Sequence, residues 1–127
     1  MNLLLDTHAF LWSITSRHMS PAADATFLDP DNSLYLSAAS YWEICIKVSI
    51  GKLTLPGNWQ DTADLAMTIN DIVWLPIEQS HCLELLALPR HHRDPFDRLL
   101  IAQARVEGLT LLSADVNFGR YDVPLIW

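Results

Sequence analysis

The segment Leu3-Leu4-Leu5-Asp6 decides the fold, because three consecutive apolar residues lead directly into an acid. A strand without polar alternation is buried on both faces, which is typical of a parallel sheet covered by helices on either side. Similar short apolar runs recur along the chain and alternate with longer helical patterns. We therefore predict an α/β fold with right-handed crossovers and a mostly parallel central sheet.

The expected elements follow one another without a linker, an internal repeat or a low-complexity tract, so we predict one domain over residues 1–127. We expect strands at residues 3–5, 34–36, 72–75, 109–112 and 123–126. We expect helices from about His8, from Ser20-Pro21, and over residues 38–50, 58–70, 78–88 and 95–107. In sheets of this class ligands bind beyond the carboxyl ends of the strands, so site residues are expected there.

The chain of 127 residues is half apolar, and its formal net charge is −7. This composition excludes a disordered tail, a collagen-like repeat and a coiled coil. The acidic balance argues against a basic nucleic-acid clamp and against attachment to anionic lipid. It does not exclude a polynucleotide substrate, because clustered carboxylates bind divalent cations that reverse the local field.

Two cysteines, Cys45 and Cys82, are too few for a disulfide scaffold, and their apolar neighbours predict buried free thiols. Trp12, Trp42 and Trp59 are expected in the core or at an interface rather than beneath stacked bases. No apolar run approaches the roughly 20 residues that span a bilayer. The first residues also lack the cationic start and cleavage site of a signal peptide. We therefore expect a cytoplasmic protein without a membrane contact.

Two acids follow predicted strands. Asp6 comes directly after the first strand, and Asp115 lies three residues after Leu112, the end of another. If both strands are parallel, both carboxylates lie at the same edge of the sheet. Each aspartate is explained equally well as the cap of a following helix, because aspartate is a favoured N-cap.

Glu43 lies on a narrow polar line of its helix, with Ser40 and Lys47 at helical spacing. Apolar residues flank this line on both sides, which predicts a largely buried helix whose polar line faces a cleft. The flanks are Trp42, Cys45, Ile46 and Ile50 on one side and Tyr41, Ile44 and Val48 on the other. The alternative is an ordinary Glu–Lys pair on a solvent-exposed strip.

The sequence Asp94-Pro95-Phe96-Asp97 begins a helix, with Asp94 as the cap and proline at the first helical position. Capping does not explain Asp97, which heads an apolar line of the helix and so points inward. A buried carboxylate is unfavourable unless a cation accompanies it. Since Gly108 alone separates this helix from the next strand, the helix begins at the carboxyl edge of the sheet.

Four acids from separate segments, Asp6, Glu43, Asp97 and Asp115, thereby converge on one rim of the predicted sheet. Four carboxylates repel one another unless hard cations hold them, and oxygen-only ligation suits Mg²⁺ or Mn²⁺. No Cys/His set of the sequence makes a closed zinc site. Cations at such a rim generate hydroxide, orient a phosphodiester and stabilise the leaving oxygen. The acids therefore predict metal-assisted phosphodiester hydrolysis.

Four ordered segments resemble the PIN-domain ribonucleases, and most closely the toxins of VapC-type toxin–antitoxin pairs. The segments are Leu3-Leu4-Leu5-Asp6-Thr7-His8; Ser40-Tyr41-Trp42-Glu43-Ile44 with Lys47 and Gly51-Lys52-Leu53; His92-Arg93-Asp94-Pro95-Phe96-Asp97-Arg98-Leu99-Leu100-Ile101-Ala102; and Leu111-Leu112-Ser113-Ala114-Asp115. The resemblance covers essentially the whole chain, and the ordered set is far more specific than any one motif.

The resemblance implies a three-layer α/β/α sandwich, RNA cleavage with Mg²⁺ or Mn²⁺, a homodimer, and a small cognate antitoxin across the active-site groove. The family's catalytic and metal-binding positions fall on the same four acids. Supporting roles fall on Ser113, near the last acid, on Thr7, and on Asp94, which either assists the site or serves only as a cap.

A basic cluster accompanies Asp97. Its arginines, Arg90, Arg93 and Arg98, are candidate RNA contacts, together with Lys47, and His91 and His92 lie among them. Such a cluster steers phosphates toward an adjacent metal site. The alternative for the cluster is a solvated loop, and for Lys47 a charge partner of the acids.

Other classes of protein fit parts of the pattern. A phosphoacceptor receiver domain has a doubly wound sheet and an acidic Mg²⁺ pocket, but it needs a lysine after its last strand, and no lysine follows Lys52. A phosphatase of the haloacid dehalogenase type needs a second acid two residues after the first, where this chain has His8. A non-catalytic interaction protein of the same fold is the third alternative, which the intact set of acids disfavours.

Overall fold

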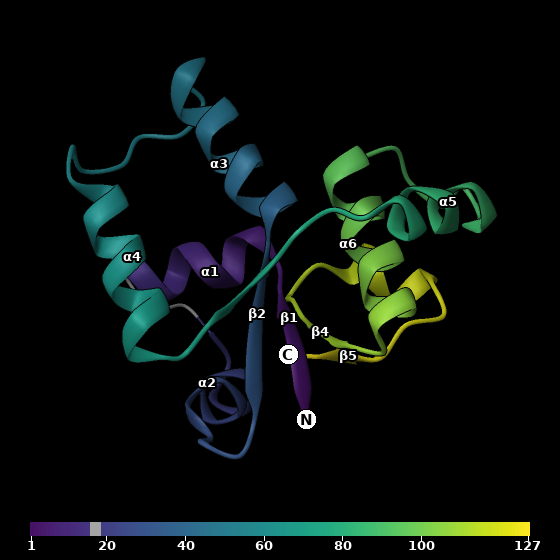
Figure 1. Cartoon of the computed structure of the whole chain (residues 1–127), viewed down its shortest axis with the longest axis horizontal. Helices are drawn as coiled ribbons and strands as arrows, with labels where there is room; N and C mark the ends of the chain where they lie inside the picture. The colour runs from purple at the N-terminus through teal and green to yellow at the C-terminus, as the bar shows by residue number, and fades with distance from the viewer. Residues whose placement is uncertain (16–18) are drawn as a thin grey trace.

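The structure, a computed structural model, describes residues 1–15 and 19–127, and within them five strands form one sheet in the order β3-β2-β1-β4-β5 (Figure 1). The strands are β1 (Asn2–Leu5), β2 (Ser33–Ser37), β3 (Val73–Leu75), β4 (Thr110–Leu112) and β5 (Leu125–Ile126). Each neighbouring pair is parallel, so the predicted parallel sheet is confirmed. The first strand lies at the centre, between β2 and β4, and the order of the strands reverses across it.

Helices cover both faces of this sheet, which confirms the three-layer arrangement (Figure 1). One face carries α1 (Thr7–Ile14), α2 (Pro21–Leu28), α3 (Ala38–Ser49) and α4 (Trp59–Ile69). The other carries α5 (Gln79–Ala87), α6 (Pro95–Glu107) and a short 3-10 helix, η1 (Val116–Arg120), which the sequence did not predict. None of the described helices is long and apolar enough to cross a membrane.

Alternate residues of β1 enter two separate cores. Leu3 and Leu5 pack with Phe10 on the α1–α4 face, whereas Leu4 packs with Leu100 on the α5–α6 face. All three leucines of the strand are fully buried. Complete burial of such a side chain contributes about 1.5–3 kcal/mol to stability. The apolar run therefore packs against both layers of helices, as its lack of polar alternation predicted.

Local signals set the start and the end of α6, and with them the position of its first turn. Asp94 Oδ1 accepts from the backbone N–H groups of Phe96 and Asp97 at 2.9 and 3.1 Å, with Pro95 at the first helical position, as predicted. Gly108 ends the helix with φ 67°, a left-handed conformation that favours glycine. Because β4 follows almost at once, α6 begins at the carboxyl edge of the sheet.

One flank of α3 is exposed, although the sequence predicted a helix buried on both flanks. The flank with Ile44 packs against the core as expected. On the other flank Trp42 is 60% exposed and Ile50 is 58% exposed. Helical spacing identifies an apolar surface but does not show whether another element covers it, and that is why this part of the prediction was wrong. Trp42 does meet Phe96 of α6, with ring centroids 5.7 Å apart.

Both cysteines are exposed free thiols, so the prediction that they are buried was wrong. Consecutive helical residues point about 100° apart, and an apolar neighbour in the sequence therefore does not share the face of the cysteine. Cys45 lies on the exposed flank of α3, and Cys82 lies on the solvent side of α5. Of the tryptophans expected in the core or at an interface, Trp59 is buried in the core, Trp12 is half-buried and Trp42 is exposed.

Candidate active site

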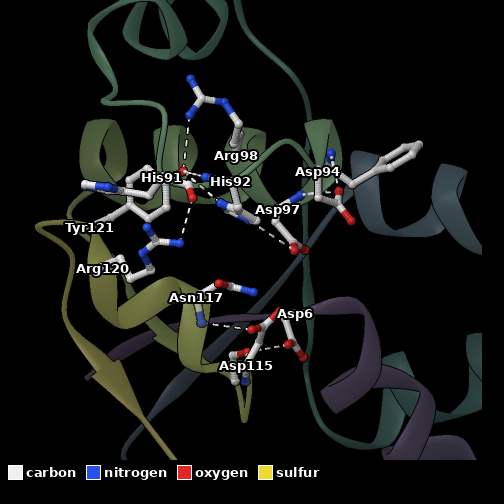
Figure 2. A network of polar contacts seen from close by, with 12 residues as sticks. Asp6, His91, His92, Asp94, Asp97, Arg98, Asp115, Asn117, Arg120 and Tyr121 are labelled. Carbon is white, nitrogen blue, oxygen red and sulfur yellow. Dashed lines mark hydrogen bonds and ion pairs between the residues drawn. The ribbon is translucent and has the colours of Figure 1, made fainter.

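The carboxyl ends of β1 and β4 bring Asp6 and Asp115 to one rim of the sheet (Figure 2). Ser113 joins them. Its hydroxyl donates to Asp6 Oδ2 at 2.5 Å and accepts from the backbone N–H of Asp115 at 3.0 Å. Asp6 is 4% exposed and Ser113 is 1% exposed. Residues separated by 107 positions thus meet because their strands are parallel neighbours.

Both aspartates are also helix caps, so the two explanations offered for them are compatible. Asp6 Oδ1 accepts from the backbone N–H of Ala9 at 2.7 Å, and Asp115 Oδ1 accepts from that of Asn117 at 2.9 Å. These bonds fix the directions of the two carboxylates. Burial raises the pKa of Asp6, and the hydrogen bonds from Ser113 and Ala9 oppose that rise.

Glu43 is buried on α3, and both of its oxygens have partners. Thr7 Oγ1 donates to Oε1 at 2.6 Å, and Lys47 Nζ lies 2.8 Å from Oε2. The hydrogen bond to Glu43 raises the pKa of Lys47, so the ammonium stays charged beside this acid. The sequence left two roles open for Lys47, a contact with RNA and a charge partner of the acids. The ion pair with Glu43 shows the second role directly.

Asp97 lies in the first turn of α6 and faces the acids at the strand ends (Figure 2). Its pKa is raised to about 7, first by burial and then by the charges of Asp94, Asp115, Glu43 and Asp6. The negative charges of the three other predicted acids therefore all act on Asp97. Asp94 serves as the cap of α6 and adds a fifth negative charge nearby.

The donor set fits a hard divalent cation. Among the described residues, no group of three or more acids, histidines or cysteines is placed to hold a metal ion. Mg²⁺, however, is usually held by one or two carboxylates, with water and substrate phosphate as its other ligands. Mutual repulsion contributes to the raised pKa of Asp97, and a cation at the rim would relieve that repulsion. The chemistry of these oxygen donors suits Mg²⁺ or Mn²⁺.

The predicted basic residues surround a cavity of about 540 Å³ beside α6. Its lining consists of Arg90, His91, His92, Arg93 and Arg98. Arg98 Nη1 donates to the Pro89 carbonyl at 2.7 Å and to the Tyr121 hydroxyl at 3.2 Å, so part of this guanidinium holds the preceding loop. Arg90 and Arg93 have exposed side chains.

Tyr121 was not among the predicted site residues, although it links the basic loop to the rim (Figure 2). His92 Nδ1 lies 2.8 Å from its hydroxyl, and His92 Nε2 lies 3.4 Å from Asp97 Oδ2. Next to it, Arg120 Nη1 donates to the His91 carbonyl at 2.7 Å. These partners are 29 positions apart, so no local pattern relates them. The sequence offered one signal for these contacts, namely that a basic and an aromatic residue, Arg120 and Tyr121, follow shortly after Asp115, the last predicted acid.

Solved structures with the same architecture include a chain of VapBC2 from Rickettsia felis, a complex bound to a DNA fragment from its promoter. That chain has a TM-score of 0.76 and 16% identity, over 99% of this chain and 98% of its own length. A chain of VapBC-1 from nontypeable Haemophilus influenzae has a TM-score of 0.65 and 18% identity, over 99% and 97%. A chain of FitAcB from Neisseria gonorrhoeae has a TM-score of 0.63 and 19% identity, over 98% and 96%. At such identities the likeness establishes the fold.

No curated protein sequence matches the chain. The family model of the PIN domain does, and it spans residues 3–124, which include all four acids at the rim. The chain therefore belongs to the PIN domain family.

Proposed function

We propose that the chain is a metal-dependent endoribonuclease and the VapC-type toxin of a toxin–antitoxin pair. The observation that carries this assignment is the rim, where Asp6, Glu43, Asp97 and Asp115 arrive from four separate segments and their charges interact. Membership in the PIN domain family supports the nuclease chemistry. Likeness in fold to chains of VapBC complexes supports the toxin assignment.

In this proposal the four acids would hold Mg²⁺ or Mn²⁺, one or two carboxylates as direct ligands and the others as nearby negative charge. Glu43 also binds Thr7 and Lys47. When bound, the cation supplies the positive charge that stabilises the attacking and leaving oxygens of the phosphodiester. Ser113 orients Asp6, and Asp94 orders the turn that carries Asp97. Because the pKa of Asp97 is about 7 without metal, about half of these carboxyls are protonated at neutral pH, and a bound cation would favour the ionised form.

We propose that the RNA backbone follows the basic cavity into the rim. Arg90 and Arg93 are exposed on this cavity, and His92 connects the cavity to Asp97. Arg98 contributes less freely, since one of its nitrogens already holds the loop. Lys47, whose side chain is 38% exposed and paired with Glu43, is the remaining candidate contact. Contacts of this kind position phosphates without reading the sequence of bases.

Cleavage of single-stranded RNA tests the enzymatic part of the proposal. The purified protein, free of any partner, should cut RNA with Mg²⁺ or Mn²⁺ and lose activity in EDTA. Asp6→Asn and Asp97→Asn should each lower the rate about 100-fold or more, as expected for loss of a charge that stabilises the transition state. Asp61→Asn, which changes an exposed acid on α4, is the matched control. Cleavage by Asp97→Asn at the parent rate would show the assignment to be wrong.

We further propose that the partner is a small antitoxin bound along the exposed flank of α3. A groove of about 370 Å³ starts at Glu43 and continues the acidic rim. Ile46, Ile50 and Phe96 give it apolar walls, and Lys47, Lys52 and Arg93 give it positive charge. The lining also includes Glu43 and Asp94, so we propose a segment whose side chains are mainly apolar, with acidic ones opposite Lys52 and Arg93. We also expect a homodimer, which sedimentation measurements would detect.

Expression in cells tests the toxin assignment separately. The chain alone should arrest growth, and co-expression of a small protein from the adjacent gene should relieve the arrest. The purified pair should have no ribonuclease activity. Normal growth with the chain alone, together with no binding protein from a neighbouring gene, would refute the toxin assignment. The nuclease assignment would stand on the cleavage assay.

A further inference from the structure

The hydroxyl of Tyr121 is a buried junction between the basic loop and α6. Three nitrogens lie around its oxygen (Figure 2). The backbone N–H of His92 donates at 3.3 Å, Arg98 Nη1 donates at 3.2 Å, and His92 Nδ1 lies at 2.8 Å. Tyr121 is 5% exposed, so water does not compete freely for these positions.

The number of donors and acceptors at this junction determines the tautomer of His92. A phenolic oxygen has two lone pairs and one proton. The two N–H donors, from the His92 backbone and from Arg98, occupy both lone pairs. The hydroxyl proton must therefore donate to His92 Nδ1, the shortest of the three contacts. With Nδ1 as an acceptor, the ring proton of the neutral histidine is on Nε2.

His92 Nε2 points at Asp97. It lies 3.4 Å from Asp97 Oδ2, and it is a buried nitrogen without a regular hydrogen-bond partner in the described part of the chain. The distance exceeds that of an ordinary N–H···O bond, but an N–H dipole at this range still favours one orientation of a carboxylate. Across residues 1–15 and 19–127, the Asp97 carboxylate accepts no hydrogen bond from any other side chain.

The loop that carries His92 is itself held in place. Arg98 Nη1 binds the Pro89 carbonyl and Arg120 Nη1 binds the His91 carbonyl, each at 2.7 Å. The Tyr121 ring also packs edge-on against both histidine rings, with centroids 4.9 Å from that of His91 and 5.4 Å from that of His92. The position and the tautomer of the His92 ring are thus both determined by the surrounding structure.

We propose that His92, held by Tyr121 as the Nε2–H tautomer, is a positioning residue that turns Asp97 Oδ2 toward itself and leaves Oδ1 for the cation. This role rests on the proposed metal-dependent function. Hydrogen-bond donors behind metal ligands orient those ligands in the same way, and their loss lowers metal affinity.

Two substitutions of His92 separate its two nitrogens. The amide of glutamine lies where Nε2 lies, so His92→Gln keeps a donor toward Asp97. The amide of asparagine lies where Nδ1 lies, so His92→Asn keeps only the contact with Tyr121. We expect His92→Asn to weaken Mn²⁺ binding about tenfold or more, and His92→Gln to bind within about threefold of the parent. Mn²⁺ affinity is measured by calorimetry at pH 8, and thermal melting in EDTA reports on folding.

A second readout does not involve metal. Long-range ¹H–¹⁵N NMR spectra distinguish the two histidine tautomers, and His92 should be the Nε2–H form in the parent and lose that preference in Tyr121→Phe. Equal Mn²⁺ affinities for the parent and a folded His92→Asn variant would overturn the positioning role, as would an Nδ1–H tautomer in the parent. If the parent itself does not bind Mn²⁺, the proposed metal-dependent function and the role of His92 both fail. If the parent binds Mn²⁺ and the His92→Asn variant binds it equally well, only the role of His92 is refuted.

Discussion

Replacement of Asp97 by asparagine should stabilise the metal-free protein at alkaline pH while it removes the proposed activity. In the folded protein the pKa of Asp97 is about 7, against an ordinary value of 3.8. At a pH between these two pKa values, Asp97 is therefore protonated in the folded state and ionised in the unfolded chain. Its stability falls as the pH rises from about 4 to 7 and is lowest above 7. Asparagine has the same shape and no charge, so the variant escapes this loss.

The size of the effect follows from the raised pKa. A difference of about 3 pKa units corresponds to about 4 kcal/mol at 1.36 kcal/mol per unit. The Asp97 side chain is 21% exposed, and solvent screening reduces the value, so we expect about 2 kcal/mol at pH 8. At pH 5 the Asp97 carboxyl of the folded parent is protonated and uncharged. Less than about half of the stability gained by Asp97→Asn at pH 8 should therefore remain.

Urea unfolding of the parent and Asp97→Asn, in EDTA at pH 5 and pH 8, measures this difference. Mn²⁺ should then reverse the order at pH 8, because a ligand that binds only the folded state adds stability, about 2.7 kcal/mol at 100 times its Kd. Asp61→Asn should show neither effect, since Asp61 is exposed on α4. An Asp97→Asn variant that is less stable than the parent in EDTA at pH 8, or a difference independent of pH, would refute the electrostatic reasoning.

Three further substitutions probe the rim, the core and the proposed partner surface. Ser113→Ala removes the 2.5 Å hydrogen bond to buried Asp6 and should cost about 1–3 kcal/mol in urea unfolding, with weaker Mn²⁺ binding in calorimetry. Leu4→Ala, at a fully buried position of the central strand, should cost about 2–5 kcal/mol in the same unfolding assay, and a smaller loss would contradict the two-sided packing of β1. Trp42→Ser, on the exposed flank of α3, should change stability by less than about 1 kcal/mol yet reduce antitoxin binding in a pull-down titration, and unchanged binding would exclude this flank as the partner surface.

The parts of the fold that the sequence predicted depend on short-range signals. The unbroken apolar run of β1 requires cover on both faces, and Asp94, Pro95 and Gly108 mark the two ends of α6 through local signals. With those ends known, the direction of α6 places Asp97 beside the strand ends before any contact is seen. That is why the four acids could be grouped from the sequence.

The parts that the sequence did not predict depend on long-range contacts. His92 and Tyr121 are 29 positions apart, and nothing in either segment encodes their hydrogen bond. The exposure of Trp42 depends on the absence of a covering helix, which a periodic pattern on α3 does not report. The same limit explains the error over Cys45, since its burial depends on what faces it rather than on its neighbours in the sequence.

The central position of β1 has a consequence for the order in which the sheet forms during synthesis. Asp6 is synthesised before the strand beside it, β4, and before Ser113, which comes 107 positions later. A nascent chain therefore carries one side of the rim long before the other exists, and the edge of β1 stays unpaired until β4 has left the ribosome. The proposed site therefore assembles only after β4 and Ser113 have been synthesised. Under the proposed function, the nuclease site is incomplete until β4 has been synthesised, and a partner made from a neighbouring message has that interval in which to arrive.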